Sequence, residues 1–179
     1  MEKYVAFLRG INVGGHHKVP MADLRKELGQ LGFENIITIL NSGNIIFEAK
    51  ADALGKLEKT ISNHLEHYFG FPIPTILRKA ETIHKIFSLD PFKGVEVTKD
   101  IRLYISLLKK DAELDLDLPW TSPDGSFKII DKQDGSVLSI LDVSVTKTPK
   151  AMGVLEKTYG KDITTRNWNT IVRIMKKFE

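Results

Sequence analysis

The chain has 179 residues, of which 42% are hydrophobic and 27% charged, an ordinary composition for one globular domain or two small ones. Its formal net charge of +3 is compatible with polyanion binding but smaller than that of dedicated nucleic-acid binders, and the absence of cysteine excludes disulfides, zinc–thiolate sites and iron–sulfur clusters held by this chain. Because no segment has the apolar core of a signal peptide or the length of a membrane span, we expect a cytoplasmic protein with no membrane contact.

The first half carries alternating strand and helix patterns. Short runs rich in β-branched and aromatic residues predict strands at residues 3–8, 36–41, 44–48 and 73–78. A first helix is predicted to begin at Pro20 and to end at Gly32, because apolar residues recur between them at spacings of three and four. A second helix follows Asp52, which we expect to be its N-cap. The dipeptide Ser42-Gly43 predicts a two-residue hairpin turn between the second and third strands.

This order, strand, helix, strand, strand, helix, strand, is typical of a ferredoxin-like subdomain within the α+β class. We therefore predict a four-stranded antiparallel sheet with two helices on one face and with strand 3–8 between the third and fourth strands. The crossover rule makes the first two strands parallel, with the third returning between them. The end of strand 3–8 and the tip of the hairpin should then lie at the same end of the sheet.

The second half predicts another small α+β subdomain that ends in two helices. A helix is expected at residues 81–89, a strand at 101–108, and a hairpin of strands 127–131 and 137–143 turned by Asp134-Gly135. The last two helices are expected from Thr148 to Gly160 and over 167–178. No low-complexity linker separates the halves, and we predict subdomains at 1–79 and 80–179. Whether the second repeats the first stays open.

An acidic run lies between these elements. Asp111, Glu113, Asp115 and Asp117 occupy alternate positions, a pattern that hard cations such as Ca²⁺ use as ligands. Charged residues at such spacing also keep an edge strand or a loop soluble. We favour the second interpretation and predict no metal site.

Residues 9–18 are the strongest candidate for a ligand-binding loop. They contain three glycines, an asparagine, an arginine, two histidines and a lysine, directly before a helix. Glycine amides in such a turn can converge into an anion-binding nest, and a helix N-terminus also favours anions. The hairpin tip should lie beside this loop. The predicted ligand-binding residues here are Arg9, Asn12, Gly14, Gly15, His17, Lys18, Asn41, Ser42 and Asn44. The alternative is that the glycines shape a long crossover and that residues 41–44 are turn chemistry alone.

A second polar motif, Thr164 to Thr170, opens the predicted last helix. Either Thr164 or Thr165 is expected to be the N-cap, and Trp168 falls on an apolar stripe, which favours burial over ligand stacking. Arg166 and Asn167 would then occupy the first turn, where an arginine is unfavourable without a partner. We predict that both reach the same anion pocket as Arg9. The surrounding segment, 147–179, carries eight lysine or arginine residues and three acidic ones.

These motifs resemble a bacterial family catalogued as domain of unknown function 1697. The resemblance is carried by residues 8–15, by 18–21, by Ser42-Gly43-Asn44 and by the motif at 164–170, and it spans nearly the whole chain. It implies an α+β fold of two subdomains, the first ferredoxin-like, and no established activity, substrate or cofactor. The chain departs from the family at 143–149, where a glycine-rich segment with serine and lysine is usual.

Three classes of function remain compatible with the sequence. The first is a binding module for a phosphorylated small molecule, a nucleotide or single-stranded nucleic acid, held by the loop from Arg9 to Lys18. Stacking residues on the sheet face would then be limited to Tyr4, Phe7 and Phe47, for which core packing is favoured. The second is a small enzyme that uses a loop histidine as acid or base. The third is a protein-interaction module with no small ligand. No cofactor and no particular oligomeric state are implied.

Overall fold

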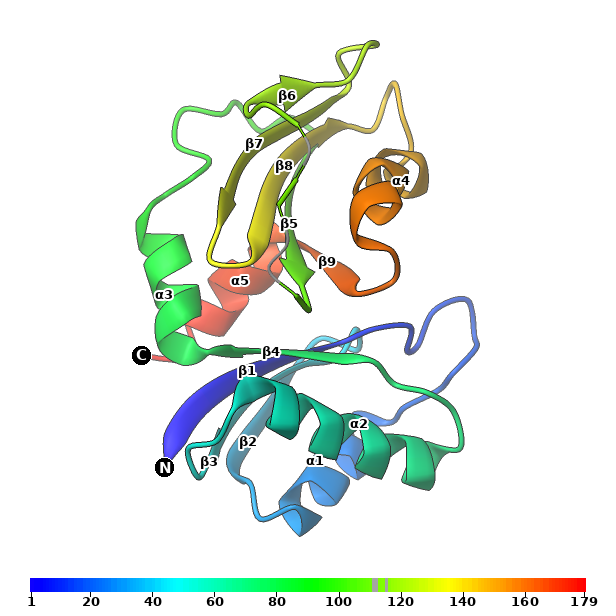
Figure 1. Cartoon of the computed structure of the whole chain (residues 1–179), viewed down its shortest axis with the longest axis vertical. Helices are drawn as coiled ribbons and strands as arrows, with labels where there is room; N and C mark the ends of the chain where they lie inside the picture. Colours follow the sequence, from blue (N-terminus) through cyan, green and yellow to red (C-terminus); the bar gives the residue numbers. More distant parts are fainter. Residues whose placement is uncertain (111–112, 115) are drawn as a thin grey trace. The chain divides into compact units, whose positions relative to one another are not determined.

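A computed structural model describes residues 1–110, 113–114 and 116–179. The chain divides into two compact units, one of Met1–Ile83 with Phe178 and the other of His84–Lys177 with Glu179. Each unit contains helices and an antiparallel sheet, as Figure 1 shows, and this confirms the predicted α+β class. The predicted subdomain bounds, 1–79 and 80–179, remain a prediction.

The first unit has the predicted ferredoxin-like order of elements. These are β1 (Glu2–Leu8), α1 (Met21–Gln30), β2 (Glu34–Ile39), β3 (Asn44–Ala49), α2 (Leu54–Phe69) and β4 (Thr75–Lys79). The strand order in the sheet is β2-β3-β1-β4, and every neighbouring pair is antiparallel. The predicted position of β1 between the third and fourth strands is therefore confirmed.

The hydrophobic core of the first unit lies between the sheet and its two helices. Alternate residues of β1, namely Tyr4, Ala6 and Leu8, pack on this side together with Leu24 of α1 and Ile61 of α2. Figure 1 shows both helices on one face of the sheet. Full burial of a large apolar side chain contributes roughly 1.5–3 kcal/mol, so this layer holds the sheet and helices together.

The helix starts differ from the prediction in detail. Helix α1 begins at Met21 with Pro20 as its N-cap, and α2 begins at Leu54 with Ala53 as its N-cap. The prediction that Asp52 caps α2 is wrong. Its carboxylate accepts a hydrogen bond from the N–H of Ala53 at 2.8 Å and forms an ion pair with Lys56 at 2.7 Å. The carboxylate that was expected to cap the helix is therefore engaged in an i to i+4 ion pair with Lys56.

The hairpin between β2 and β3 has a four-residue turn, so the predicted two-residue turn is wrong. Ile39 pairs directly with Asn44, which leaves residues 40–43 in the turn. The Asn44 side chain donates to the carbonyl of Ile39 at 2.8 Å and to the hydroxyl of Ser42 at 2.9 Å. The Asn44 amide thus pairs with polar groups on both sides of the wider turn and stabilises it. Leu40 has a φ of +60°, an unusual conformation for a bulky residue.

The second unit is built on a five-stranded antiparallel sheet. Its elements are α3 (Ala80–Ser88), which contains the division between the units, β5 (Ile101–Leu108), β6 (Trp120–Thr121), β7 (Phe127–Gln133), β8 (Ser136–Asp142), α4 (Thr148–Tyr159), β9 (Ile163–Asn167) and α5 (Trp168–Met175). The strand order is β6-β7-β8-β5-β9. The predicted turn at Asp134-Gly135 is confirmed, because both residues have positive φ, +47° and +70°.

Helix α4 packs on one face of this sheet over a core that includes Leu155, Phe127 and Val137 (Figure 1). The predicted bounds of α4, from Thr148 to the residue before Gly160, are confirmed. Two members of the acidic run, Asp111 and Asp115, lie outside the described residues, and so the interpretation of that run stays a prediction.

Strand β9 was not predicted and changes the reading of the 164–170 motif. Thr164 and Thr165 lie in β9 and pair with β5, so the prediction that one of them caps the last helix is wrong. Arg166 also lies in β9, opposite Ile105, and not in the first turn of a helix. The N-cap of α5 is Asn167, whose side chain accepts from the N–H of Asn169 at 3.0 Å. The β-branched run before Arg166 favours a strand once a partner is available.

The predicted burial of Trp168 is confirmed. The residue is 9% exposed. Its ring lies 6.1 Å from that of Phe87 in a stacked arrangement and meets Phe92 edge-on at 5.1 Å. Such pairs add to the free energy of burying the ring, so Trp168 serves the core of the second unit.

Candidate functional site

Four segments of the first unit meet at one end of its sheet. They are the end of β1, the loop at 9–19, the turn at 40–43 and the segment before β4. The N–H of Leu8 donates to the carbonyl of Gly43 at 2.8 Å, and the N–H of Arg9 donates to the carbonyl of Pro74 at 2.9 Å. The predicted meeting of the glycine loop and the hairpin tip is therefore confirmed.

The glycine loop itself folds into a small hairpin. The N–H of Asn12 donates to the carbonyl of His17, and that of His16 to the carbonyl of Val13, each at 3.0 Å. Gly14 and Gly15 form the tip with φ of +59° and +76°, a conformation that suits glycine. Within the described part of the chain, the N–H groups of these two glycines donate to no other residue. Both residues are exposed, so an acceptor can approach them.

Asn12 holds this hairpin against its surroundings. Its side-chain Nδ2 donates to the carbonyl of Asn41 at 2.7 Å and to the carbonyl of Val19 at 3.1 Å, while its Oδ1 accepts from the N–H of Val19 at 2.8 Å. Both amide hydrogens and the amide oxygen are thus engaged. Asn12 was predicted to contact a ligand, and the geometry gives it the role of positioning the loop.

Gly43 lets the turn at 40–43 approach β1 closely. It has a φ of +81°, and a Cβ placed on it would lie 2.7 Å from Cβ of Leu8 and 2.9 Å from Cδ1 of Ile11. Neither distance is tolerated between carbon atoms. Glycine is therefore required at this position for two independent reasons, and the close contact places Asn41 and Ser42 beside the loop.

The imidazole of His17 is held in one orientation. Its Nδ1 lies 3.1 Å from the carbonyl oxygen of Gly10, and one ring face stacks on Phe71 with centroids 4.3 Å apart and planes 11° apart. Because a carbonyl oxygen only accepts, Nδ1 must carry the proton in this hydrogen bond. In the neutral ring Nε2 is then the nitrogen that can accept a hydrogen bond.

The remaining predicted residues of this end of the sheet differ in exposure. Lys18, Asn41 and Ser42 are exposed, and Arg9 is half-buried. Asn44 is completely buried. Its side chain therefore shapes the turn and presents no surface to a ligand in this conformation.

Arg166 and Asn167 belong to the second unit. Arg166 is 8% exposed, and its Nη1 donates to the hydroxyl of Thr164 at 2.6 Å and to the carbonyl of Thr165 at 3.2 Å. Burial lowers the pKa of Arg166 to about 10, so the guanidinium stays charged at neutral pH. Its participation, and that of Asn167, in the pocket of Arg9 remains a prediction.

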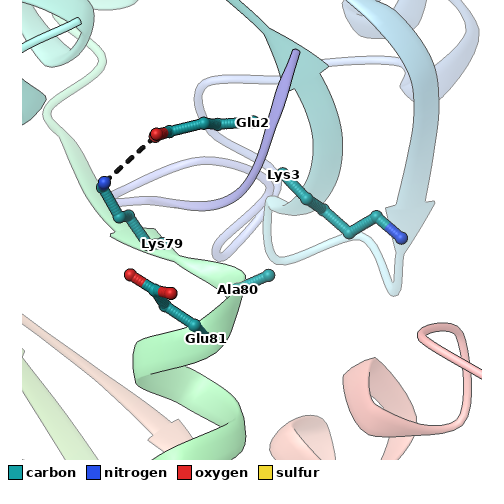
Figure 2. Close-up of a pocket in the computed structure, with 5 residues that line it drawn as sticks. All are labelled: Glu2, Lys3, Lys79, Ala80 and Glu81. Carbon is teal, nitrogen blue, oxygen red and sulfur yellow. Dashed lines mark ion pairs between the residues drawn. The ribbon is translucent and has the colours of Figure 1, made fainter. Parts of the chain in front are cut away.

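A cavity of about 230 Å³ lies at the opposite end of the first sheet, lined by Glu2, Lys3, Lys79, Ala80 and Glu81 (Figure 2). Nζ of Lys79 lies 3.1 Å from Oε2 of Glu2. Their hydrogen bond lowers the pKa of Glu2 and raises that of Lys79, so both are charged at neutral pH. Lys79 is paired with Glu2, and Nζ of the second lysine, Lys3, lies 3.9 Å from Oε1 of Glu48. With both lysines paired and Glu81 as a second carboxylate in the lining, this cavity is a poor anion site, and the glycine loop is the better candidate.

No group of three or more histidine, aspartate or glutamate side chains in the described part of the chain is arranged to hold a metal ion. No helix among residues 1–110, 113–114 and 116–179 is long and apolar enough to cross a membrane.

Comparisons with known proteins identify relatives of the chain, and their descriptions name no activity. A family model described as "Protein of unknown function (DUF1697)" matches residues 1–118. The solved structure of the conserved bacterial protein SP0830 from Streptococcus pneumoniae is similar with a TM-score of 0.76 and 23% identity, over 99% of each chain. Likeness at this identity shows a shared fold alone. None of the curated proteins matches the chain.

Proposed function

This chain belongs to the family described as protein of unknown function DUF1697, and we propose that it binds a small phosphorylated ligand at the loop from Arg9 to Lys18. The family description names no activity, so the proposal rests on the geometry of the first unit. The observation that carries it is the bond from Asn12 to the carbonyl of Asn41. This bond holds the glycine loop, which carries Arg9 and Lys18, beside the hairpin tip at one end of the sheet.

The loop offers the groups that bind phosphate. Gly14 and Gly15 are exposed, and their N–H groups are neutral donors, as in the backbone nests that hold anions. Lys18, three residues after Gly15, adds a full charge, and Arg9 adds a second one at the start of the loop. Hydrogen bonds between such cations and phosphate oxygens are about twice as strong as neutral ones. Together these groups favour a phosphate monoester over a neutral ligand.

The loop is also preorganised. Asn12 and His17 have φ of +54° and +50°, conformations that cost a non-glycine residue free energy. The bonds of the Asn12 amide and the stacking of His17 on Phe71 hold both residues there. A loop that is ordered before binding loses less entropy when the ligand arrives. This supports a ligand site over a passive connection.

The proposal is tested by calorimetric titration with ribose 5-phosphate and with inorganic pyrophosphate, compared with ribose. Phosphorylated probes should bind and ribose should not. Lys18→Ala should weaken binding about tenfold, the value of one charge-assisted hydrogen bond. Lys59→Ala, which removes an exposed lysine from α2, is the matched control and should leave the affinity unchanged. Equal weakening by both variants would mean that only overall charge attracts the probe, and the site would be rejected.

A further inference from the structure

We infer that the phosphorylated ligand is a nucleoside phosphate whose base stacks on the outer face of His17. This inference rests on the proposed function and names the ligand class for the same loop. It is carried by a row of aromatic rings that lies beside the loop, within the first unit.

The row joins the loop to the end of α2. The ring of His17 stacks on Phe71 at 4.3 Å, Phe71 lies 6.3 Å from Phe69, and Phe69 meets Tyr68 edge-on at 4.8 Å. Phe69 and Phe71 also pack against the core of the unit, so the row is anchored from below. His17 and Tyr68 are its exposed members, Tyr68 at 47%.

His17 is the member best placed to receive a base. One of its faces is covered by Phe71, and the residue is nevertheless exposed, so its opposite face is open to a planar ligand. Its hydrogen bond to the carbonyl of Gly10 restrains the orientation of the ring. Aromatic side chains that present a fixed face in this way act as stacking platforms for bases of any sequence.

The positions along the loop match the two parts of a nucleotide. Lys18 directly follows His17, and Gly15 precedes it by two residues. A base on the ring of His17 therefore brings its 5′-phosphate to the part of the loop that carries the free N–H groups and the lysine. A phosphorylated ligand without a planar group would leave the exposed ring unused.

The stacking surface differs from that of ferredoxin-like RNA binders, which display aromatic residues on the open face of the sheet. In this chain Tyr4, Phe7 and Phe47 are completely buried. They are therefore closed to a base, and the sequence-based expectation of core packing is confirmed for Tyr4 and Phe47, which belong to the core between the sheet and its helices. Stacking in the first unit falls to the loop and not to the sheet.

Base and phosphate occur together in a free nucleotide and in each unit of a single strand. The experiment therefore compares five probes by calorimetry: ribose 5-phosphate, adenosine, AMP, ADP and a short oligoadenylate. AMP should bind at least about tenfold more tightly than ribose 5-phosphate, the gain expected from one stacked base. If the oligoadenylate binds more tightly per site than AMP, the ligand is a single strand. If AMP binds more tightly, the ligand is a free nucleotide. Both results support a stacked base on His17.

Two histidine variants separate the ring from the loop. His17→Asn removes the ring but tolerates the positive φ, and it should abolish the preference for AMP over ribose 5-phosphate. Any loss of loop order weakens both probes by the same factor, whereas loss of the ring weakens AMP alone. His16→Asn is the matched control, because His16 is exposed and takes part in no ring stack among the described residues. It should leave the preference for AMP intact. In NMR spectra, the base protons of AMP should shift upfield with the wild-type protein and not with His17→Asn.

The outcomes distinguish this inference from the function on which it rests. Equal affinity for AMP and ribose 5-phosphate, or equal weakening of both by His17→Asn, overturns the stacked base and leaves the phosphate site standing. Failure of every phosphorylated probe to bind overturns both. Binding of adenosine as tightly as AMP also overturns both, because the phosphate then contributes nothing.

Discussion

Nδ2 of Asn12 donates to the backbone carbonyl of Asn41 at 2.7 Å, across 29 residues of chain. The same amide is bonded twice to the backbone of Val19. One side chain thus joins three stretches of the first unit: the glycine loop, the approach to α1 and the turn between β2 and β3. The relative placement of the proposed phosphate-binding groups depends on it.

We predict that Asn12→Ala destabilises the first unit by about 1–3 kcal/mol, because the backbone groups of Val19 and Asn41 lose their partners. Urea unfolding followed by circular dichroism measures this loss. Hydrogen exchange of the Val19 amide, which donates to Oδ1 of Asn12, should accelerate. The matched control is Asn35→Ala. Asn35 has a similar φ of +52°, and its side chain makes an exposed hydrogen bond to Glu48. Alanine at position 35 therefore causes the same backbone strain without breaking buried contacts to the backbone. Equal destabilisation by the two variants would show that the bonds from Asn12 to Val19 and Asn41 add nothing.

A second prediction concerns the close approach at Gly43. Gly43→Ala should be clearly more destabilising than Gly70→Ala, although the two glycines have nearly the same φ, +81° and +82°. Alanine at position 70 meets nothing within 4 Å and suffers backbone strain alone, of about 1 kcal/mol. Alanine at position 43 also collides with Leu8 and Ile11, which adds roughly 1–3 kcal/mol. The denaturant midpoints of the two variants measure this difference. Similar midpoints would show that the turn at 40–43 moves to accommodate the Cβ, and would contradict the prediction.

A third prediction follows from the burial of Arg166. Arg166→Ala should destabilise the second unit by about 1–3 kcal/mol, because the acceptors on Thr164 and Thr165 lose their donor in a buried site. Arg173→Ala removes an exposed arginine from α5 and should change stability by less than about 0.5 kcal/mol. Tryptophan fluorescence follows unfolding of this unit, which contains both tryptophans. An unchanged midpoint for Arg166→Ala would contradict the structural role of this arginine.

A fourth prediction concerns acid stability. Hydrogen bonds from the hydroxyl of Ser122 and from the N–H and hydroxyl of Ser126 hold the pKa of Asp124 well below its usual range. A lowered carboxyl pKa means that its stabilising effect is complete above the unfolded value, about 3.9, and is lost as the pH falls toward the folded value. Wild-type protein should therefore lose stability between pH 4 and pH 2 more steeply than Asp124→Asn. Urea midpoints at several pH values test this, with Asp162→Asn as the exposed control. Parallel pH profiles for wild type and Asp124→Asn would refute it.

The order of elements in the first unit was accessible from sequence because its signals are local. Apolar periodicity located both helices, and the order of elements together with the crossover rule placed β1 inside the sheet. That placement in turn located the glycine loop beside the hairpin tip. The turn at Asp134-Gly135 and the helix that ends before Gly160 were predictable for the same reason, since Gly135 and Gly160 supply the positive φ that these positions need.

The functions of individual polar side chains were decided by tertiary structure. Asn12 and Asn44 were both predicted to contact a ligand. The amide of Asn12 bonds to the backbone of Asn41, 29 residues away, and the buried amide of Asn44 bonds to the carbonyl of Ile39 and the hydroxyl of Ser42 inside its own turn. Thr164 and Thr165 satisfied the pattern of a helix cap, but pairing with β5 drew them into β9. Cross-strand partners and the stacking of His17 on Phe71 join residues far apart in the chain. Local periodicity carries no information about such contacts, because their free energy depends on the packing of the complete fold.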